Sequence, residues 1–237
     1  MSDPFYFKQF VIHQDCCTMK VGTDGILLGA WADVSGVEKA LDIGAGTGLI
    51  AIMLGQRTES AEIHAVEIEQ ASFVQAGQNM RASPWADRLV VKHVSIQDYS
   101  RQTDERYDLI VSNPPFFSGG TFSQNQDRNS VRHTIKLPHG DLLTSARTLM
   151  TDHGRFCVIL PLLEGLRFEE MARSYKLFCT RKIEVKPKKD KPTERLLLQF
   201  ERAEKEEKTE TLVIQKERRN EWTKEFITLT GGFYLKM

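Results

Sequence analysis

The sequence predicts an α/β fold in which helices flank a mostly parallel sheet. Short apolar runs alternate with helical patterns from residue 39 to about residue 180, and this alternation generates parallel strands joined by helices. The chain has 237 residues, of which 41% are hydrophobic and 27% charged, a composition typical of globular domains. Since a domain commonly holds about 150 residues, this length leaves room for one large α/β domain or for a domain with a small appendage. We predict a single domain overall, with the sheet in residues 39–237 and an N-terminal segment, residues 1–38, ahead of its first strand.

In the first half of the chain, strands are expected at four apolar runs, because a strand that is covered on both faces lacks a polar side. These runs are residues 39–43, 62–67, 89–94 and 107–112. Two segments between them, residues 49–56 and 69–81, are expected to be helices.

The second half of the chain continues this alternation and then departs from it. Helices are predicted over residues 141–149 and 163–175, with a short one at 222–229. Strands are predicted over residues 155–160, 178–185, 194–201 and 211–214, of which 178–185 and 194–201 form a hairpin. The hairpin is expected to be antiparallel, because a polar break separates two apolar runs. The charged run at residues 201–210 is interpreted as a solvated connector.

Charge, cysteine usage and hydrophobic runs exclude several classes of protein. The 32 basic and 32 acidic residues give a formal net charge of zero. The four cysteines, Cys16, Cys17, Cys157 and Cys179, form no C-x-x-C pair, and we expect no metal. No apolar run approaches the roughly 20 residues of a membrane span, and the first ten residues lack the pattern of a secretory signal. We therefore expect a cytoplasmic protein.

The loop after the first predicted strand is the most informative segment, and it reads Asp42-Ile43-Gly44-Ala45-Gly46-Thr47-Gly48. Alternate glycines let the backbone turn sharply between a strand and a helix and approach a ligand closely, while the helix N-terminus presents free N–H groups. A dinucleotide loop of the form G-x-G-x-x-G would need glycine at Leu49. The loop predicts either a nucleoside-type cofactor site other than an NAD site or a simple strand-to-helix turn.

Acidic residues near this loop sharpen the prediction. Glu67 ends the second strand, where a carboxylate can accept hydrogen bonds from both ribose hydroxyls of a nucleoside. Asp98 follows the third strand, in a position to meet an adenine amino group. Asp42 is expected either to hold the loop by accepting backbone N–H bonds or to bond the amino-acid end of a cofactor. Alone, each of these acids could be a solvated carboxylate, but together with the glycine loop they predict an adenosine site.

The run Asn113-Pro114-Pro115-Phe116 directly follows the fourth strand. It could be a stiff exit turn. It also suits chemistry on an exocyclic amine, which is a poor nucleophile because its lone pair is delocalised into the base. The Asn113 side-chain oxygen and the Pro114 carbonyl, aimed at the amine hydrogens, would favour the pyramidal form that attacks a sulfonium methyl group. The face of Phe116 offers a flipped base a stacking surface.

In this order, the glycine loop, the two strand-end acids and the asparagine–diproline run resemble class I S-adenosylmethionine-dependent methyltransferases that modify amino nitrogens. Residues 19–31 resemble the segment that such enzymes place over the methionine moiety, although they also fit a Gly-rich turn, capped by Asp24, that opens a helix. The resemblance runs from Phe7 to Leu235 and is closest to the bacterial valine-tRNA adenine-37 N6-methyltransferases.

The resemblance implies a Rossmann-like class I methyltransferase fold, with a seven-stranded, mostly parallel sheet, flanking helices and an antiparallel C-terminal hairpin. It makes residues 1–38 a cofactor-capping segment ahead of the methyltransferase domain. For S-adenosylmethionine it implies contacts from Lys20, Thr23, Asp24, Asp42, Gly44, Gly46, Gly48, Glu67, Asp98 and Asn113. The residues from Asn113 to Phe116 would meet the target base. Many relatives have tyrosine in place of Phe116, so no role that needs a phenolic proton is assigned.

A chain without net charge must bind a polyanion through a local patch. Residues 181–195 hold seven basic and three acidic residues, and Lys186, Lys188 and Lys189 are the predicted RNA contacts on an exposed hairpin tip. A second candidate patch comprises Arg128, Arg132 and Lys136, after the asparagine–diproline run. Either patch could instead be a solvated charged loop.

These observations predict an enzyme that methylates the N6 amino group of an adenine in tRNA, at position 37 of a valine tRNA if the resemblance holds. The expected partner is tRNA, without membrane or metal, and a monomer is favoured. Three alternatives stay open: methylation of a protein glutamine amide, methylation of DNA adenine, and a noncatalytic RNA-binding protein on the same fold.

Overall fold

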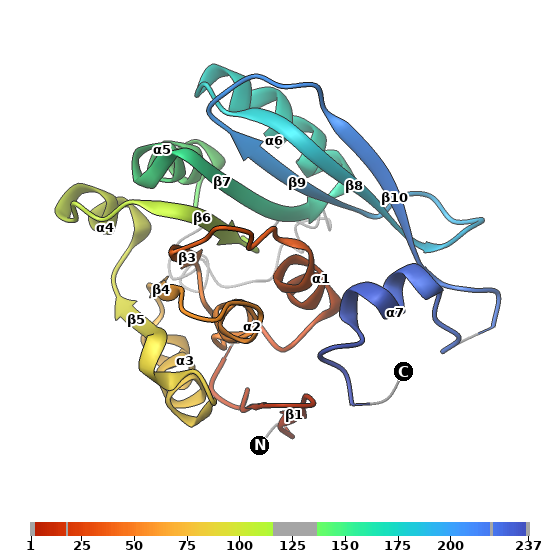
Figure 1. Ribbon diagram of the computed structural model, residues 1–237, viewed down its shortest axis with the longest axis horizontal. Helices are drawn as coiled ribbons and strands as arrows, with labels where there is room; N and C mark the ends of the chain where they lie inside the picture. The colour runs from red at the N-terminus through yellow and green to blue at the C-terminus, as the bar shows by residue number, and fades with distance from the viewer. Residues whose placement is uncertain (1–2, 18, 116–136, 219, 236–237) are drawn as a thin grey trace, which may run out of the picture.

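The computed structural model describes residues 3–17, 19–115, 137–218 and 220–235 (Figure 1). Its main sheet has the strand order β10-β8-β9-β7-β6-β3-β4-β5. The strands are β3 (Lys39–Ile43), β4 (Glu62–Glu67), β5 (Leu89–His93), β6 (Tyr107–Ser112), β7 (Met150–Pro161), β8 (Phe178–Lys188), β9 (Arg195–Glu201) and β10 (Lys208–Gln215). β9 runs antiparallel to β7 and β8, and every other pair of neighbours in this sheet is parallel.

Helices cover both faces of the sheet (Figure 1). In order, they are α1 (Thr23–Trp31), α2 (Leu49–Arg57), α3 (Gln70–Ala82), a short 3₁₀ turn (Ala86–Arg88), α4 (Ile96–Gln102), α5 (His139–Leu149), α6 (Leu162–Ser174) and α7 (Lys224–Thr230). Side chains of α1, α2, α3 and α7 share one apolar core, and those of α4, α5 and α6 share another. The predicted arrangement, a sheet between helices, is confirmed.

The strand β6 shows how one apolar run serves both cores. Leu109 and Val111 belong to the core beneath α1 and α2, whereas Ile110 between them belongs to the core beneath α4 and α5. Successive side chains of a strand point to opposite faces. The continuous apolar run is therefore what a central strand covered on both sides requires.

The main sheet contains eight strands, one more than the seven that the resemblance implied. The predicted hairpin is present as β8 and β9, but β10 joins the sheet as an eighth strand beside β8, from the pair Lys208↔Arg181 to the pair Gln215↔Lys188. The charged run at residues 201–210, predicted to be a solvated connector, thus ends inside a strand. The strand predicted at residues 211–214 is confirmed within β10. An edge strand keeps polar residues on its exposed side, and the polar start of β10 hid where the strand begins.

The chain reverses direction across the sheet between β5 and β6. It runs outward from β3 through β4 to β5 and then returns to β6 on the other side of β3. The loops after β3 and β6 therefore diverge and leave a crevice at the carboxyl ends of these strands, where open α/β sheets bind ligands. The glycine loop follows β3 and Asn113 follows β6.

Two buried amide side chains of α3 anchor the N-terminal segment beside this crevice. Asn79 Nδ2 donates to the carbonyl oxygens of His13 and Thr47, each at 2.8 Å, and Asn79 Oδ1 accepts from the His13 N–H at 3.0 Å. Gln75 Oε1 accepts from the Cys16 N–H at 3.2 Å. One asparagine thus connects the N-terminal segment to the glycine loop.

The two ends of the chain lie together (Figure 1). β1 (Phe5–Tyr6) and β2 (Val11–Ile12) form a small antiparallel sheet that the sequence did not predict. Phe7 forms a β-bridge with Tyr234, and the Lys8 N–H donates to the Phe233 carbonyl at 2.8 Å. No helix among the described residues is long and apolar enough to cross a membrane.

Candidate active site

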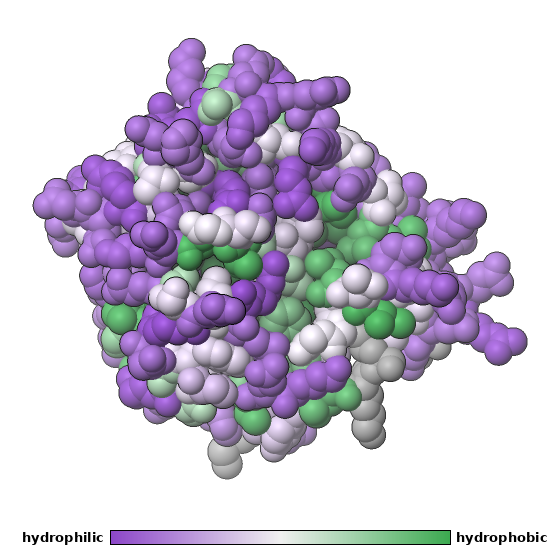
Figure 2. Space-filling model, in the orientation of Figure 1, coloured by the Kyte–Doolittle hydropathy of each residue, from purple (hydrophilic) through white to green (hydrophobic). Residues whose placement is uncertain are grey.

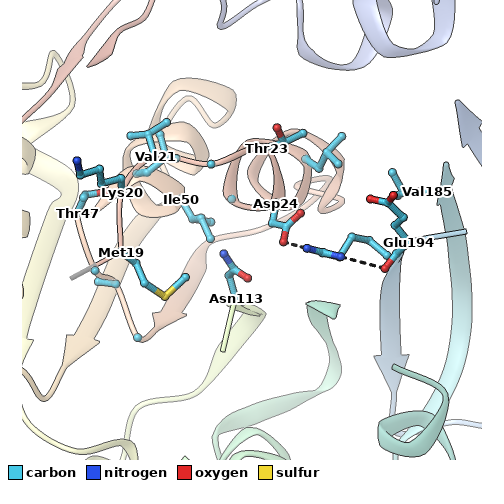
Figure 3. Close-up of a pocket in the computed structure, with 18 of the residues that line it drawn as sticks. Met19, Lys20, Val21, Thr23, Asp24, Thr47, Ile50, Asn113, Val185 and Glu194 are labelled. Carbon is cyan, nitrogen blue, oxygen red and sulfur yellow. Dashed lines mark hydrogen bonds and ion pairs between the residues drawn. The ribbon is translucent and has the colours of Figure 1, made fainter. Parts of the chain in front are cut away.

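A pocket of about 450 Å³ occupies the crevice. Its walls come from the N-terminal segment with the start of α1, from the loops after β3 and β6, and from the C-terminal strands (Figure 3). Six predicted cofactor residues line it: Lys20, Thr23, Asp24, Gly44, Gly46 and Asn113. Four others, Asp42, Gly48, Glu67 and Asp98, do not.

The glycine loop has the left-handed backbone that its glycines were expected to permit. Gly44 and Gly46 have φ angles of 76° and 54°, which L side chains rarely adopt. A Cβ atom placed at either residue would meet nothing within 4 Å. The N–H groups of Gly44 and Ala45 both donate to the Val66 carbonyl, at 3.0 and 3.1 Å. The loop therefore forms a fixed but open floor of the pocket.

Glu67 fastens this loop. Its Oε2 accepts from the Gly46 N–H at 2.8 Å, and its Oε1 accepts from the Glu69 N–H at 2.9 Å. The residue is only 8% exposed, so its orientation is fixed by these bonds. Its contact with a ribose stays a prediction.

Asp42 lies wholly buried beneath the loop. Its Oδ2 accepts from the Ala51 N–H of α2 at 3.2 Å, while its Oδ1 has no hydrogen-bond partner among the described residues. Asp42 was expected either to accept backbone N–H bonds from the loop or to bond the amino-acid end of a cofactor. The observed bond is closer to the first role, although its donor belongs to α2 and not to the loop. Burial, with a smaller effect of the Glu67 carboxylate, raises the pKa of Asp42 from 3.8 to about 7.

Asp98 lies outside the pocket, in the first turn of α4. Its Oδ2 accepts from the Ser95 hydroxyl at 2.7 Å, and its Oδ1 is 2.6 Å from Arg101 Nη2. These two partners lower the pKa of Asp98, the Ser95 bond most. In the structure, the Asp98 carboxylate takes part in hydrogen bonds at the N-terminus of α4. Its contact with an adenine stays a prediction.

Asn113 reaches the middle of the pocket from the end of β6 (Figure 3). Its Oδ1 is buried and has no hydrogen-bond partner in the described part of the chain. A buried unpaired acceptor is unfavourable unless a ligand donates to it. Pro114 is buried and Pro115 is exposed. Phe116, like Arg128, Arg132 and Lys136, lies outside the residues that the structure describes.

An ion pair closes the opposite side of the pocket. Arg195, the first residue of β9, donates from Nε to Asp24 Oδ2 in the first turn of α1 at 2.8 Å, and from Nη1 to the Glu194 carbonyl at 3.1 Å (Figure 3). Sequence reasoning included Arg195 only in the basic run and did not place it in a pocket. A separation of 171 residues from Asp24 leaves no local pattern that could pair them.

The lysines predicted to bind RNA do not share one exposed tip, because β8 continues through Lys188. Lys186 and Lys188 are partly buried on this strand, and only Lys189 is exposed. Lys188 Nζ donates to the Glu217 carbonyl at 2.7 Å. β8 tolerates Pro187 here because beyond Val185 it pairs with β10 alone.

A second cavity, of about 1050 Å³, lies between the ends of β8 and β10 and α7. The charged residues that line it are Lys188, Lys189, Lys216, Asp190, Glu217 and Glu225. Three basic side chains are thus balanced by three acidic ones. On the face of the molecule that Figure 2 shows, apolar side chains gather around α1 and towards the neighbouring ends of β8 and β10, within a mostly hydrophilic surface. RNA binding by Lys186, Lys188 and Lys189 stays a prediction.

Within the described ranges, one group of side chains has the geometry of metal ligands: Glu169, Cys179 and Glu207, whose ligand atoms lie within 4.8 Å of one another. Lys182 Nζ lies 2.8 Å from Glu169 and 2.9 Å from Glu207. The single ammonium group thus pairs with both carboxylates, and its hydrogen bond is the main cause that lowers the pKa of Glu207 to about 2. The expectation that the protein uses no metal stays a prediction.

Comparisons with known proteins agree with the motifs. A family model described as methyltransferase small domain matches residues 23–159. A protein of Trichodesmium erythraeum (strain IMS101), named tRNA1(Val) (adenine(37)-N6)-methyltransferase, is 49% identical over 234 residues, which are 98% of this chain and 98% of that protein. A protein of the same name from Actinobacillus succinogenes is 44% identical over 233 residues, 98% of this chain and 97% of its own.

Solved structures resemble the chain at low identity. A protein from Agrobacterium tumefaciens described as a predicted O-methyltransferase superposes with a TM-score of 0.71 at 17% identity, over 89% of this chain and 96% of that one. The ribosomal protein L11 methylase of Lactobacillus delbrueckii subsp. bulgaricus gives 0.53 at 16% identity, over 76% and 77%. These likenesses concern the fold, and they confirm the class I methyltransferase fold that the sequence motifs implied.

Proposed function

Since the chain belongs to the methyltransferase small domain family, and within it to the group of the tRNA1(Val) (adenine(37)-N6)-methyltransferases, we propose that it transfers a methyl group to N6 of adenine 37 in a valine tRNA. The observation that carries this proposal is Asn113 Oδ1, which is buried beside the open glycine floor and has no hydrogen-bond partner among the described residues. A tRNA substrate also supports the expectation of a cytoplasmic protein.

The donor side of the pocket fits S-adenosylmethionine. Gly44 and Gly46 line the pocket and leave open space where side chains would stand. The two oxygens of Glu67 each accept one backbone N–H, and a carboxylate has about four acceptor positions, so capacity for ribose hydroxyls is left. When bound, S-adenosylmethionine supplies an electrophilic sulfonium methyl group.

The N-terminal segment, residues 1–38, supports this assignment as a cap over the cofactor. Lys20 and Thr23 line the pocket, and the segment is held to the glycine loop through Asn79. A cofactor beneath it would be shielded from water, which strengthens the electrostatic interactions within the site.

Asn113 supplies the chemistry on the acceptor. Its Oδ1 and the Pro114 carbonyl oxygen accept hydrogen bonds from the two N6 hydrogens, which turns the nitrogen lone pair out of the base plane. The lone pair would thus face the methyl group that the bound donor would supply; transfer would leave the sulfur as a neutral thioether, and one N6 proton would leave to solvent. Since Oδ1 is already buried and no described residue donates to it, the acceptor needs little reorganisation when the amine arrives.

A labelling experiment tests the function. The protein is incubated with methyl-labelled S-adenosylmethionine and, separately, with a valine tRNA transcript, the same transcript with guanine at position 37, double-stranded DNA and a protein pool. We expect label only in the first tRNA and N6-methyladenosine in its nucleoside digest. Label in the guanine-37 transcript, the DNA or the protein pool would reject the proposed acceptor.

A further inference from the structure

The pocket has two chemically different sides, and Asn113 lies between them (Figure 3). One side is the glycine loop with the N-terminal segment. The other is formed by Val185, Pro187, Glu194, Arg195 and Ile214, from the two strands of the hairpin, its turn, and β10. These residues follow residue 159, where the match to the family model ends. The family motifs therefore leave this second wall without an assigned role.

The second wall suits a planar base better than a methionine chain. Val185 is 2% exposed, and it stands on β8 next to Leu212 of β10 and Arg195 of β9. Val185 backs this part of the wall, and the partly exposed Pro187 and Ile214 offer apolar surface against which a ring can pack. The glycine loop provides what a cofactor needs: an open floor and a helix N-terminus. The acceptor amine must approach Asn113 from the side that the cofactor leaves free, which is the hairpin side.

The Asp24–Arg195 ion pair fixes the hairpin at its distance from α1. The two charged side chains are 23% and 28% exposed. Solvent screens such a pair less than it screens an exposed one. The hairpin and α1 make a second contact, away from the Asp24–Arg195 ion pair. There, Arg181 of β8 lies above the Trp31 ring of α1, at 5.0 Å. Loss of the ion pair is therefore expected to loosen the pocket end of the hairpin more than the rest of it.

We propose that the hairpin wall is the acceptor subsite for the flipped adenine nucleotide, and that Asp24 and Arg195 are positioning residues that hold this wall in place. The inference rests on the proposed function. It reassigns Asp24, which the sequence resemblance placed with the cofactor, to the RNA side of the reaction.

The test is a double-mutant cycle with Asp24→Asn and Arg195→Gln. For each variant we measure KM and kcat with the valine tRNA transcript, and Kd for S-adenosylhomocysteine by calorimetry. We expect each single variant to raise the tRNA KM about tenfold, to change kcat less than twofold and to leave the Kd unchanged within about twofold. The double variant should be no worse than either single variant, because both remove the same interaction.

Asp33→Asn is the matched control, since Asp33 and Arg155 form a comparable ion pair at 2.7 Å that does not line the pocket. Its tRNA KM should stay close to that of the wild type. Circular dichroism establishes that every variant is folded, and Arg195→Lys, which keeps the charge, should recover part of the loss.

Three outcomes would overturn the inference. A weakened Kd in Asp24→Asn would return Asp24 to the cofactor site, additive KM effects would show that the two residues act separately, and an unchanged KM would leave the wall without a role. If the wild type binds S-adenosylhomocysteine but does not methylate the tRNA, the proposed function itself fails and this inference fails with it.

Discussion

The two walls of the pocket are built in different ways. The loop wall is held by backbone hydrogen bonds and by buried polar side chains, Asp42, Glu67 and Asn79. The hairpin wall is joined to α1 at the pocket by a partly exposed ion pair, Asp24–Arg195. Backbone bonds and buried amides fix one geometry, whereas charged side chains at a surface can exchange partners. On the proposed assignment, buried bonds would preorganise the donor side, whereas the hold of the acceptor side on α1 at the pocket would depend on this ion pair.

The largest effect is expected where the two walls meet. Asn113→Ala should lower kcat by about 2 to 4 kcal/mol in transition-state free energy, because the lost acceptor acts on the amine as it becomes nucleophilic. The S-adenosylhomocysteine Kd should change little. Single-turnover kinetics with the tRNA transcript measure the first quantity and calorimetry the second.

Ser112→Ala serves as the control for this variant. The Ser112 hydroxyl is buried at the end of the same strand and donates to the Ile43 carbonyl at 2.9 Å, so its loss perturbs the neighbouring backbone without removing the acceptor. A kcat of Asn113→Ala equal to that of Ser112→Ala would reject the role of the amide oxygen.

The second-largest effect is expected on cofactor binding and concerns the loop wall alone. Glu67→Ala should weaken S-adenosylhomocysteine binding by about 1.5 to 3 kcal/mol, since it removes a buried charged acceptor and releases the Gly46 N–H. Glu62→Ala, at the other end of β4 and 47% exposed at its side chain, should bind normally. If both variants show the same Kd in calorimetry, the loop does not depend on Glu67.

Asp42 makes the stability of the loop wall pH-dependent. Its folded-state pKa, about 7, lies above the ordinary 3.8, so its contribution to stability is fully present below about pH 4 and is lost as the pH rises through 7. Asp42→Asn cannot ionise. We therefore expect the free energy of unfolding of the wild type, relative to Asp42→Asn, to fall by about 2.5 kcal/mol between pH 5 and pH 8.

Urea unfolding at the two pH values measures this difference. Asp108→Asn serves as the control variant, because it removes a carboxylate at the opposite end of β3, where Asp108 Oδ2 accepts N–H bonds from Glu38 and Lys39. A pH trend for Asp42→Asn equal to that of the wild type would mean that the buried carboxyl is ionised at no additional cost.

The smallest effect is expected at the outer end of the hairpin. Replacing Lys186, Lys188 and Lys189 together by glutamine should raise the tRNA KM by about threefold and flatten its dependence on salt. The effect is small because acidic side chains balance the lysines of the neighbouring cavity. Steady-state kinetics at several salt concentrations measure it, and an unchanged slope would move the RNA contact elsewhere.

The loop wall could be predicted from the sequence because its residues are local or occur at strand ends. Gly44, Gly46 and Asn113 directly follow apolar runs, and parallel strands bring their carboxyl ends together. Arg195 could not be found in this way, because it lies 171 residues from Asp24. Asn79 was missed for a related reason: a polar residue in a helix suggests a solvated face, and only the fold shows it 1% exposed.

The meeting of the chain ends has a consequence for engineering. Because Phe7 bridges Tyr234 and the Lys8 N–H bonds to Phe233, a short linker could join the termini and the chain could be reopened at a distant surface turn. Circular permutants with new ends between α4 and β6 would keep both sides of the crevice covalently continuous, whereas new ends between β8 and β9 would sever the hairpin. A comparison of the two permutants would test whether the hairpin contributes to the binding of the nucleic acid, as proposed.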